Sequence, residues 1–238
     1  MQPAHLRPGQ GPASALARYP ADVVLAALRP HLLPERAAKL DAVAAARLYG
    51  VQAVLEDLRD PHNAGAALRS CESMGVLRVH IVSVHHRFRT AARVTQGCEK
   101  WLEVARWGDI ESCAAALRAA GVKLYAGVPG AAVSLADLDP HQPMALAFGN
   151  EHTGLSPRLL ALCDGEFTIP MHGCSQSLNV SVSAAVSLHV VTEARRRALG
   201  RPGDLDEPAQ AALRARYYAL DLRAPEQIVE RYLAQRGA

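Results

Sequence analysis

Residues 169–183 read IPMHGCSQSLNVSVS, and they set the interpretation of the segments on either side. A short strand, Glu166–Ile169, is expected to run into a polar loop and then directly into an apolar helix. Ser177 and Asn179 place a hydroxyl and an amide at the start of that helix, where free backbone N–H groups attract polar partners. These two side chains are either ordinary helix caps or part of a binding site, and this segment alone leaves both interpretations open.

The segment that follows, Asn179–Val191, alternates apolar and polar residues in the manner of a strand. A strand of that length would be unusual, and the chain continues into TEARRRAL, which is typical of a helix. We therefore expect a mostly buried helix here.

Towards the N-terminus, short Val- and Ile-containing segments alternate with helical ones. The expected strands are Val51–Glu56, Arg78–Val84, Trp101–Arg106, Val122–Ala126, Met144–Phe148 and Glu166–Ile169. The expected helices between them are Ala64–Gly75, Asp109–Ala120 and Ser156–Leu162. This alternation predicts an α/β fold, with a mainly parallel sheet covered by helices on both faces.

The flanking segments have a different character. Residues 1–50 are expected to form an N-terminal leader (1–20) and a helix, Pro34–Tyr49. Residues 201–238 are expected to form a C-terminal helical extension, with helices Pro208–Leu220 and Pro225–Arg236. The α/β domain would then occupy residues 51–200.

Two further segments carry polar residues where strands are expected to end. Asn63 lies at a strand-to-helix turn, whose positive helix end favours an anion, and Arg69 follows six residues later. Glu151 lies in the loop GNEHTGLS, after the strand Met144–Phe148. The carboxyl edge of a parallel sheet is where open α/β proteins bind ligands. Taken singly, each of these residues fits an ordinary helix cap, turn or surface position as well as it fits a binding site.

The composition narrows the class of protein. The formal net charge is +3, which excludes a histone-like polybasic protein, although nearly all the positive charge is arginine. Arginine suits phosphate contacts, but a GC-rich genome would also enrich it, and composition leaves both explanations open.

The five cysteines form no CxxC pair, so neither a zinc site nor a disulfide framework is expected. No apolar run predicts a signal peptide or a membrane span, and we expect a cytoplasmic protein without a metal.

The three polar segments, in this order and with these separations, resemble the signature motifs of the SpoU family of RNA ribose 2′-O-methyltransferases. The resemblance extends from about Val51 to Leu199, and Gly97–Trp101 is similar to another element of the family. Within the family the chain is most similar to the branch that modifies guanosine 18 of tRNA (TrmH). The 23S rRNA branch shares DPHN and SLNVSV but usually carries a separate N-terminal RNA-binding domain, for which residues 1–50 are too few.

The resemblance implies a SPOUT fold, in which a deep trefoil knot lies in the C-terminal half of the sheet, and it implies a homodimer. It also implies that S-adenosylmethionine is bound in the knot loops, largely by backbone groups. The residues expected to contact it are Gly127, Gly149, Ile169, Met171 and Leu178. The expected substrate is tRNA. The alternatives are rRNA or, more distantly, a non-catalytic RNA-binding role.

The resemblance further implies a catalytic set. Its members are Asn63, Arg69, Glu151, Ser177 and Asn179. Family precedent assigns deprotonation of the 2′-hydroxyl to Arg69, but a guanidinium in a protein normally stays protonated, so its role stays open. Arg196 and Lys100 are the expected RNA contacts. The chain departs from the family pattern at Cys98-Glu99 and at Gly127, where threonine is frequent.

Overall fold

The computed structural model describes residues 15–85 and 88–236, which divide into two compact units. Unit 1 comprises residues 48–203 within the described ranges. Unit 2 combines residues 15–47 with residues 204–236, so it draws on both ends of the chain. Each unit is described by itself.

Unit 1 is built on a parallel sheet of six strands among the described residues, in the order β3-β2-β1-β5-β4-β6. The strands are β1 (Val51–Glu56), β2 (Arg78–Val82), β3 (Glu103–Trp107), β4 (Lys123–Gly127), β5 (Met144–Phe148) and β6 (Gly165–Phe167). The central strand β1 pairs with β2 through Ala53 and Val79, and with β5 through Val51 and Met144. All residues of β1, β2 and β5 are buried, as expected for strands covered on both faces.

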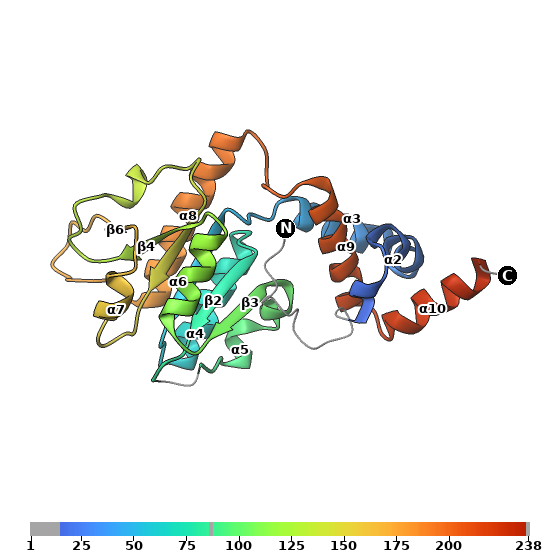
Figure 1. The fold of residues 1–238 in the computed structure, drawn as a ribbon, viewed down its shortest axis with the longest axis horizontal. Coiled ribbons are helices and arrows are strands. Elements are labelled where there is room, and N and C mark those ends of the chain that lie inside the picture. The colour runs from blue at the N-terminus through green and yellow to red at the C-terminus, as the bar shows by residue number, and fades with distance from the viewer. Residues whose placement is uncertain (1–14, 86–87, 237–238) are drawn as a thin grey trace. The chain divides into compact units, whose positions relative to one another are not determined.

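Helices cover both faces of this sheet (Figure 1). The helices of unit 1 are α4 (Pro61–Ser73), α5 (Ala92–Thr95), α6 (Ile110–Ala119), α7 (Pro157–Leu160) and α8 (Val180–Leu199), with 3₁₀ turns η3 (Cys98–Trp101) and η4 (Leu135–Asp137). One core layer joins α4 and α8 to the sheet residues Leu55 and Leu146. The other joins α6 and α7 to Val54 and Ala147. The predicted α/β class, with a mainly parallel sheet and helices on both faces, is confirmed. The trefoil knot stays a prediction.

Local sequence explains where the helices near the sheet edge begin and end. The Asp60 carboxylate accepts a hydrogen bond of 2.8 Å from the His62 backbone N–H, and Pro61 occupies the first helical position of α4. The helix therefore begins at Pro61 and not at the predicted Ala64. Helix α8 begins at its cap Asn179 and ends at Gly200, which has a φ of 64°. The helix predicted for this segment is confirmed despite its strand-like alternation, but it is not mostly buried, since only six of its 20 residues are buried.

A row of buried polar side chains crosses the sheet on three neighbouring strands. The Trp107 indole N–H donates to His80 Nδ1 at 3.0 Å, and His80 Nε2 lies 2.7 Å from Gln52 Oε1. Nδ1 is therefore the bare nitrogen, and Nε2 carries the hydrogen that Gln52 accepts. Burial lowers the pKa of His80 to about 3, and the positive charge of Arg78 adds to this effect.

Unit 2 consists of helices from both ends of the chain. They are η1 (Leu16–Arg18), α2 (Ala21–Leu28), η2 (Arg29–His31), α3 (Pro34–Ala45), α9 (Glu207–Asp221) and α10 (Pro225–Arg236). Helix α9 packs against α2 and α3, and α10 packs against α2. The Tyr218 hydroxyl donates to Asp41 at 2.8 Å, and Arg36 Nε donates to Asp221 at 2.9 Å. Of the leader expected over residues 1–20, positions 1–14 lie outside the described residues, while Leu16 is buried in unit 2. Within the described ranges, every helix is too short or too polar to cross a lipid bilayer.

Candidate active site

A hydrogen-bonded cluster lies at the carboxyl ends of β1 and β5. Glu151, in the loop after β5, accepts a hydrogen bond of 3.0 Å from Asn63 Nδ2 in the first turn of α4. The same carboxylate accepts from the backbone N–H groups of Arg59 at 3.1 Å and Asp60 at 3.2 Å. Glu151 therefore ties the loop after β1 and the start of α4 to the loop after β5.

Asn179 extends this cluster to α8. Its Nδ2 donates to Asn63 Oδ1 at 3.0 Å, and its Oδ1 accepts from the Ser181 backbone N–H at 2.8 Å and from the Ser181 hydroxyl at 2.7 Å. The carboxylate of Glu151 can only accept hydrogen bonds, so it fixes which way the Asn63 amide points. The structure thus brings Asn63, Glu151 and Asn179 together from three separate segments.

The charge of Glu151 follows from its surroundings. Burial by itself raises the pKa of this carboxyl. The hydrogen bonds from Asn63 and from the backbone together lower the pKa by more than burial raises it, so the net pKa lies below its ordinary value. A carboxylate with a low pKa and several donors already bound to it is a poor proton acceptor. Glu151 is therefore suited to orient Asn63 and the loop after β1.

The loop that carries Glu151 is itself tightly held. The buried Asn150 donates from Nδ2 to the Asp57 carbonyl at 2.8 Å, and its Oδ1 accepts from the His152 backbone N–H at 2.9 Å. The backbones of Asn150 and Gly154 exchange two hydrogen bonds, of 2.9 and 2.8 Å. This closure brings Gly149 so near that a Cβ there would lie 2.3 Å from the Gly154 backbone. Gly149 therefore shapes the loop, and it does not line the pocket described next.

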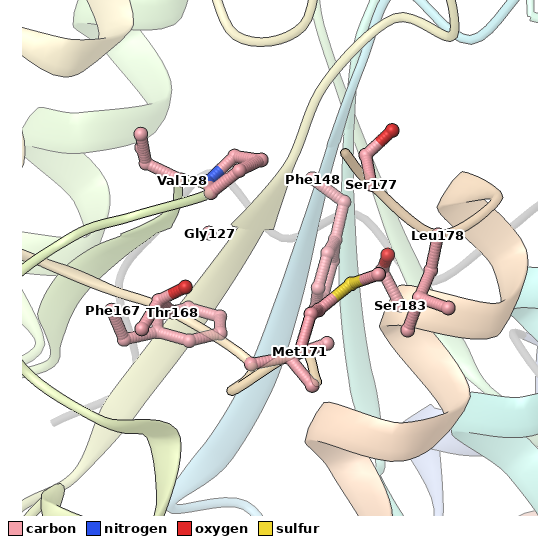
Figure 2. A pocket seen from close by; sticks show the side chains of 11 residues that line it. Gly127, Val128, Phe148, Phe167, Thr168, Met171, Ser177, Leu178 and Ser183 are labelled. Atoms are coloured by element: carbon pink, nitrogen blue, oxygen red, sulfur yellow. The ribbon is translucent and has the colours of Figure 1, made fainter. Parts of the chain in front are cut away.

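A pocket of about 400 Å³, part of it open to solvent, lies beside this cluster (Figure 2). It is lined by Gly127, Val128, Pro129, Phe148, Phe167, Thr168, Ile169, Met171, Ser177, Leu178 and Ser183. In Figure 2, Phe167 and Thr168 stand on one side of the pocket, opposite Ser177 and Leu178. Five residues were expected to contact S-adenosylmethionine, and four of them, all except Gly149, line this pocket.

The residues of the pocket fit S-adenosylmethionine. Phe148, Phe167 and Leu178 supply apolar walls for a flat ring, and none of the lining side chains carries a charge. A Cβ at Gly127 would lie 3.1 Å from the Phe167 ring and 3.3 Å from the Ala147 carbonyl, so glycine keeps this wall open. Sequence reasoning missed Phe148 and Phe167, whose burial in strands gave no sign of a ligand.

The remaining predicted site residues occupy three different settings. Arg69 is exposed on α4, and within residues 15–85 and 88–236 its guanidinium makes neither a hydrogen bond nor an ion pair. Lys100 is exposed and stacks over the Trp101 ring at 4.5 Å. Arg196 donates to the Met74 and Pro202 carbonyls at 2.9 Å each, so its guanidinium is engaged within unit 1.

Comparison with known proteins is consistent with this geometry. The model of the SpoU rRNA Methylase family matches residues 50–189. The chain is 35% identical to the tRNA (guanosine(18)-2′-O)-methyltransferase of Thermus thermophilus over 73% of this chain and 88% of that protein.

Solved structures show the same relationship. The TrmH/SpoU tRNA modifying enzyme of A. aeolicus matches with a TM-score of 0.68 and 26% identity, over 79% of this chain and 96% of that one. The AdoMet-bound rRNA methyltransferase of Sinorhizobium meliloti matches with a TM-score of 0.54 and 27% identity, over 63% of this chain and 56% of that one.

Proposed function

The chain belongs to the SpoU rRNA Methylase family, and from this premise we propose that it methylates the ribose 2′-hydroxyl of guanosine 18 in tRNA. It is an RNA ribose 2′-O-methyltransferase whose methyl donor is S-adenosylmethionine. The observation that carries the proposal is the cluster in which Glu151, Asn63 and Asn179 join three segments beside an apolar pocket.

The reaction sets two requirements for the protein. S-adenosylmethionine supplies an activated methyl group, so the site has to align a ribose oxygen with that methyl carbon and allow the hydroxyl to lose its proton. The pocket walls, with Gly127, Ile169, Met171 and Leu178, would hold the donor. Alignment of the RNA falls to the polar cluster and to Arg69.

Each polar residue has a role that its contacts support. Glu151 holds the Asn63 amide in one orientation, and Asn63 in turn holds Asn179 at the start of α8. Ser177 lines the pocket, and its hydroxyl would be available to the methyl donor or to the RNA. Among the described residues the Arg69 guanidinium has no hydrogen-bond or ion-pair partner, which suits it to bind a phosphate next to the target ribose and to hold the hydroxyl in line. The proton is then released to solvent or to a further group.

The choice of tRNA over rRNA rests on the extent of the match. The tRNA-modifying relatives are matched over most of their length, whereas the rRNA methyltransferase of Sinorhizobium meliloti is matched over 56%. A match over most of the length of a tRNA-modifying enzyme favours tRNA as the substrate.

The same premise supports a homodimer. Val182 and Val186 are 45% and 37% exposed on α8, one helical turn apart, and Leu178 is 36% exposed just before them. Exposed apolar residues at this spacing favour a covered face. Light scattering of the purified protein would show twice the monomer mass.

Incubation with labelled S-adenosylmethionine and an unmodified tRNA transcript tests the proposal. We expect label at the 2′-oxygen of guanosine 18, located by nuclease mapping, and none in a transcript whose position 18 is 2′-deoxyguanosine. Labelling of 23S rRNA in place of tRNA would contradict the substrate. Donor binding by calorimetry without labelling of either RNA would favour a non-catalytic role.

A further inference from the structure

Three exposed arginines lie on α4 and on the segment that packs beside it. They are Arg69 on α4, Arg89 in the loop after β2 and Arg93 on α5, and we call them the arginine ridge. All three are exposed. Their guanidinium groups form no hydrogen bond or ion pair with any residue in the described part of the chain.

The segment that carries Arg93 packs along α4, the helix that carries Arg69. The Ala91 N–H donates to the Pro61 carbonyl at 3.1 Å, at the first turn of the helix. One turn later, a Cβ on Gly65 would lie 3.2 Å from Val94 Cβ. Further along, the charge of Arg69 lowers the pKa of Cys98, although burial raises it overall to about 11. Residues 91–98 therefore run in the same direction as α4 from residue 61 to residue 69.

The base of this segment is anchored to the sheet edge. The Asp57 carboxylate accepts from the backbone N–H groups of Val84 at 2.8 Å and His85 at 3.0 Å. The close contact between Gly65 and Val94 anchors the other end, because a larger residue at position 65 would have to displace α5. Arg93 is thus carried by a helix that packs closely against α4, and Arg89 lies two residues before the Ala91 N–H that bonds to Pro61.

Both acidic and basic side chains lie near the arginine ridge, and the three arginines outnumber the two glutamates. Glu72 and Glu99 both influence the pKa of Cys98, so they lie at the end of the ridge nearest Arg69. Arg89 and Arg93 lie towards the first turn of α4. By contrast, many other arginines of the chain are paired, such as Arg78 with Glu103 and Arg158 with Glu111. Exposed arginines without partners are available to bind an external anion.

The strand order places the ridge with respect to the rest of the site. The donor pocket draws on the ends of β4, β5 and β6, and the cluster of Asn63 and Glu151 lies at β1 and β5. The segment carrying Arg89 and Arg93 follows β2, on the other side of β1. Pocket, polar cluster and ridge therefore follow one another along the carboxyl edge of the sheet, and Figure 1 shows α5 beside α4 at this end.

We propose that the arginine ridge binds the phosphates of the RNA strand that continues past the target nucleotide, with Arg89 and Arg93 as positioning residues. This inference rests on the proposed function. The helix rises about 12 Å between residues 61 and 69, at 1.5 Å per residue. A nucleic acid strand carries roughly one phosphate per 3.4 Å of helix axis, so the ridge spans about three phosphates.

The salt dependence of RNA binding tests the ridge. Each phosphate contact contributes roughly 0.7 to the slope of log affinity against log salt for a single strand, and roughly 0.9 for a duplex. Arg89→Ala and Arg93→Ala should each reduce the ratio of affinities at 50 and 200 mM salt by about threefold. Binding would be measured by fluorescence anisotropy with a labelled, unmodified tRNA transcript.

Kinetics separate positioning from chemistry. In each variant the KM for tRNA should rise by about three- to tenfold, while kcat and the affinity for S-adenosylmethionine stay within twofold of wild type. Arg93→Lys keeps the charge and should restore most of the salt slope. Unchanged salt slopes in both alanine variants, or a fall in kcat without a change in KM, would overturn the proposal.

A matched control excludes a general effect of net charge. Arg158→Glu changes the charge by the same amount as Arg93→Glu, but Arg158 lies on α7 and pairs with Glu111. Only Arg93→Glu should weaken RNA binding strongly, and an equal loss in both variants would contradict the ridge. Since binding is measured without turnover, these outcomes stand whether or not guanosine 18 is the methylated position.

Discussion

The side-chain amide of Asn63 donates a hydrogen bond of 3.0 Å to the carboxylate of Glu151, although 88 positions separate the two residues. The contact joins the first turn of α4 to the loop after β5. Because Asn63 also accepts from Asn179, a change at Glu151 is transmitted to the start of α8. The geometry of the cluster depends on a residue that need not touch the reacting atoms.

Glu151→Ala should therefore reduce both stability and turnover. It removes the acceptor of the hydrogen bonds from Asn63, Arg59 and Asp60, and we expect a loss of about 1–3 kcal/mol in the free energy of unfolding. Methyl transfer should fall by about tenfold or more, since Asn63 loses its fixed orientation. The affinity for S-adenosylmethionine should stay within twofold of wild type. Chemical denaturation, turnover and calorimetry would measure the three effects.

Glu166→Ala, at an exposed position on β6, is the control and should leave stability unchanged. Equal losses of stability in Glu151→Ala and Glu166→Ala would contradict the orienting role of Glu151.

Arg69→Ala should abolish methyl transfer, by about a hundredfold or more, while S-adenosylmethionine binding persists. The guanidinium is exposed and forms no hydrogen bond or ion pair within the described ranges, so its loss should have little effect on folding. Single-turnover assays and calorimetry on the same preparation would separate the two effects. Near-normal turnover in this variant would exclude Arg69 from the reaction.

Gly149→Ala should disrupt the loop that carries Glu151. The added Cβ would lie 2.3 Å from the Gly154 backbone, which cannot move without breaking the paired hydrogen bonds of Asn150. We expect a destabilisation of about 2–4 kcal/mol in denaturant titrations. At Gly108 a Cβ would meet nothing within 4 Å, so Gly108→Ala is the matched control and should be neutral. Equal stability of the two variants would show that the loop adapts.

His80 should make the stability of unit 1 sensitive to mild acid. Its pKa falls from an ordinary 6.5 to about 3 in the folded protein, mainly because of burial, so the unfolded chain binds the proton more readily. The stabilising contribution is complete above pH 6.5 and is lost as the pH falls from there towards 3, by about 1.4 kcal/mol per pH unit.

Denaturation of wild type and of His80→Leu between pH 7.5 and 5.5 would measure this effect. The variant should be less stable at pH 7.5, because Trp107 and Gln52 lose their partner, but its stability should depend less on pH. His189→Gln, at an exposed position on α8, should keep the wild-type slope. An identical slope in all three proteins would mean that His80 titrates alike in both states.

The sequence predicted best the strands that lie deepest in the sheet. Val51–Glu56 and Met144–Phe148 match β1 and β5 residue for residue, because strands buried on both faces are dominated by apolar residues. The predicted helix Pro225–Arg236 also has the bounds of α10, since Pro225 occupies its first position. For α8 the alternation of apolar and polar residues indicated a strand, and only the length of the segment and its continuation into TEARRRAL favoured the helix.

Features fixed by distant contacts were not predicted. Helix α5 has only four residues, too few for a periodic signal, and it is placed by its contact with Gly65. Helix α2, Ala21–Leu28, was missed because it has only eight residues and begins without a side-chain cap. The motif positions Asn63, Glu151 and Asn179 were identified through their resemblance to a family. Their hydrogen bonds depend on how the loops after β1 and β5 meet, which no local pattern encodes.

The assembly of unit 2 from both ends of the chain affects the order in which the protein can fold during synthesis. Residues 15–47 leave the ribosome before unit 1, yet the helices they pack against, α9 and α10, are made only after the whole of unit 1. Buried side chains such as Leu28 and Ala44 are therefore made long before α9 and α10, the helices that complete unit 2. At about 5–20 residues per second, this interval lasts roughly ten to forty seconds. During that time the exposed N-terminal helices are the part of the nascent chain most suited to bind a chaperone.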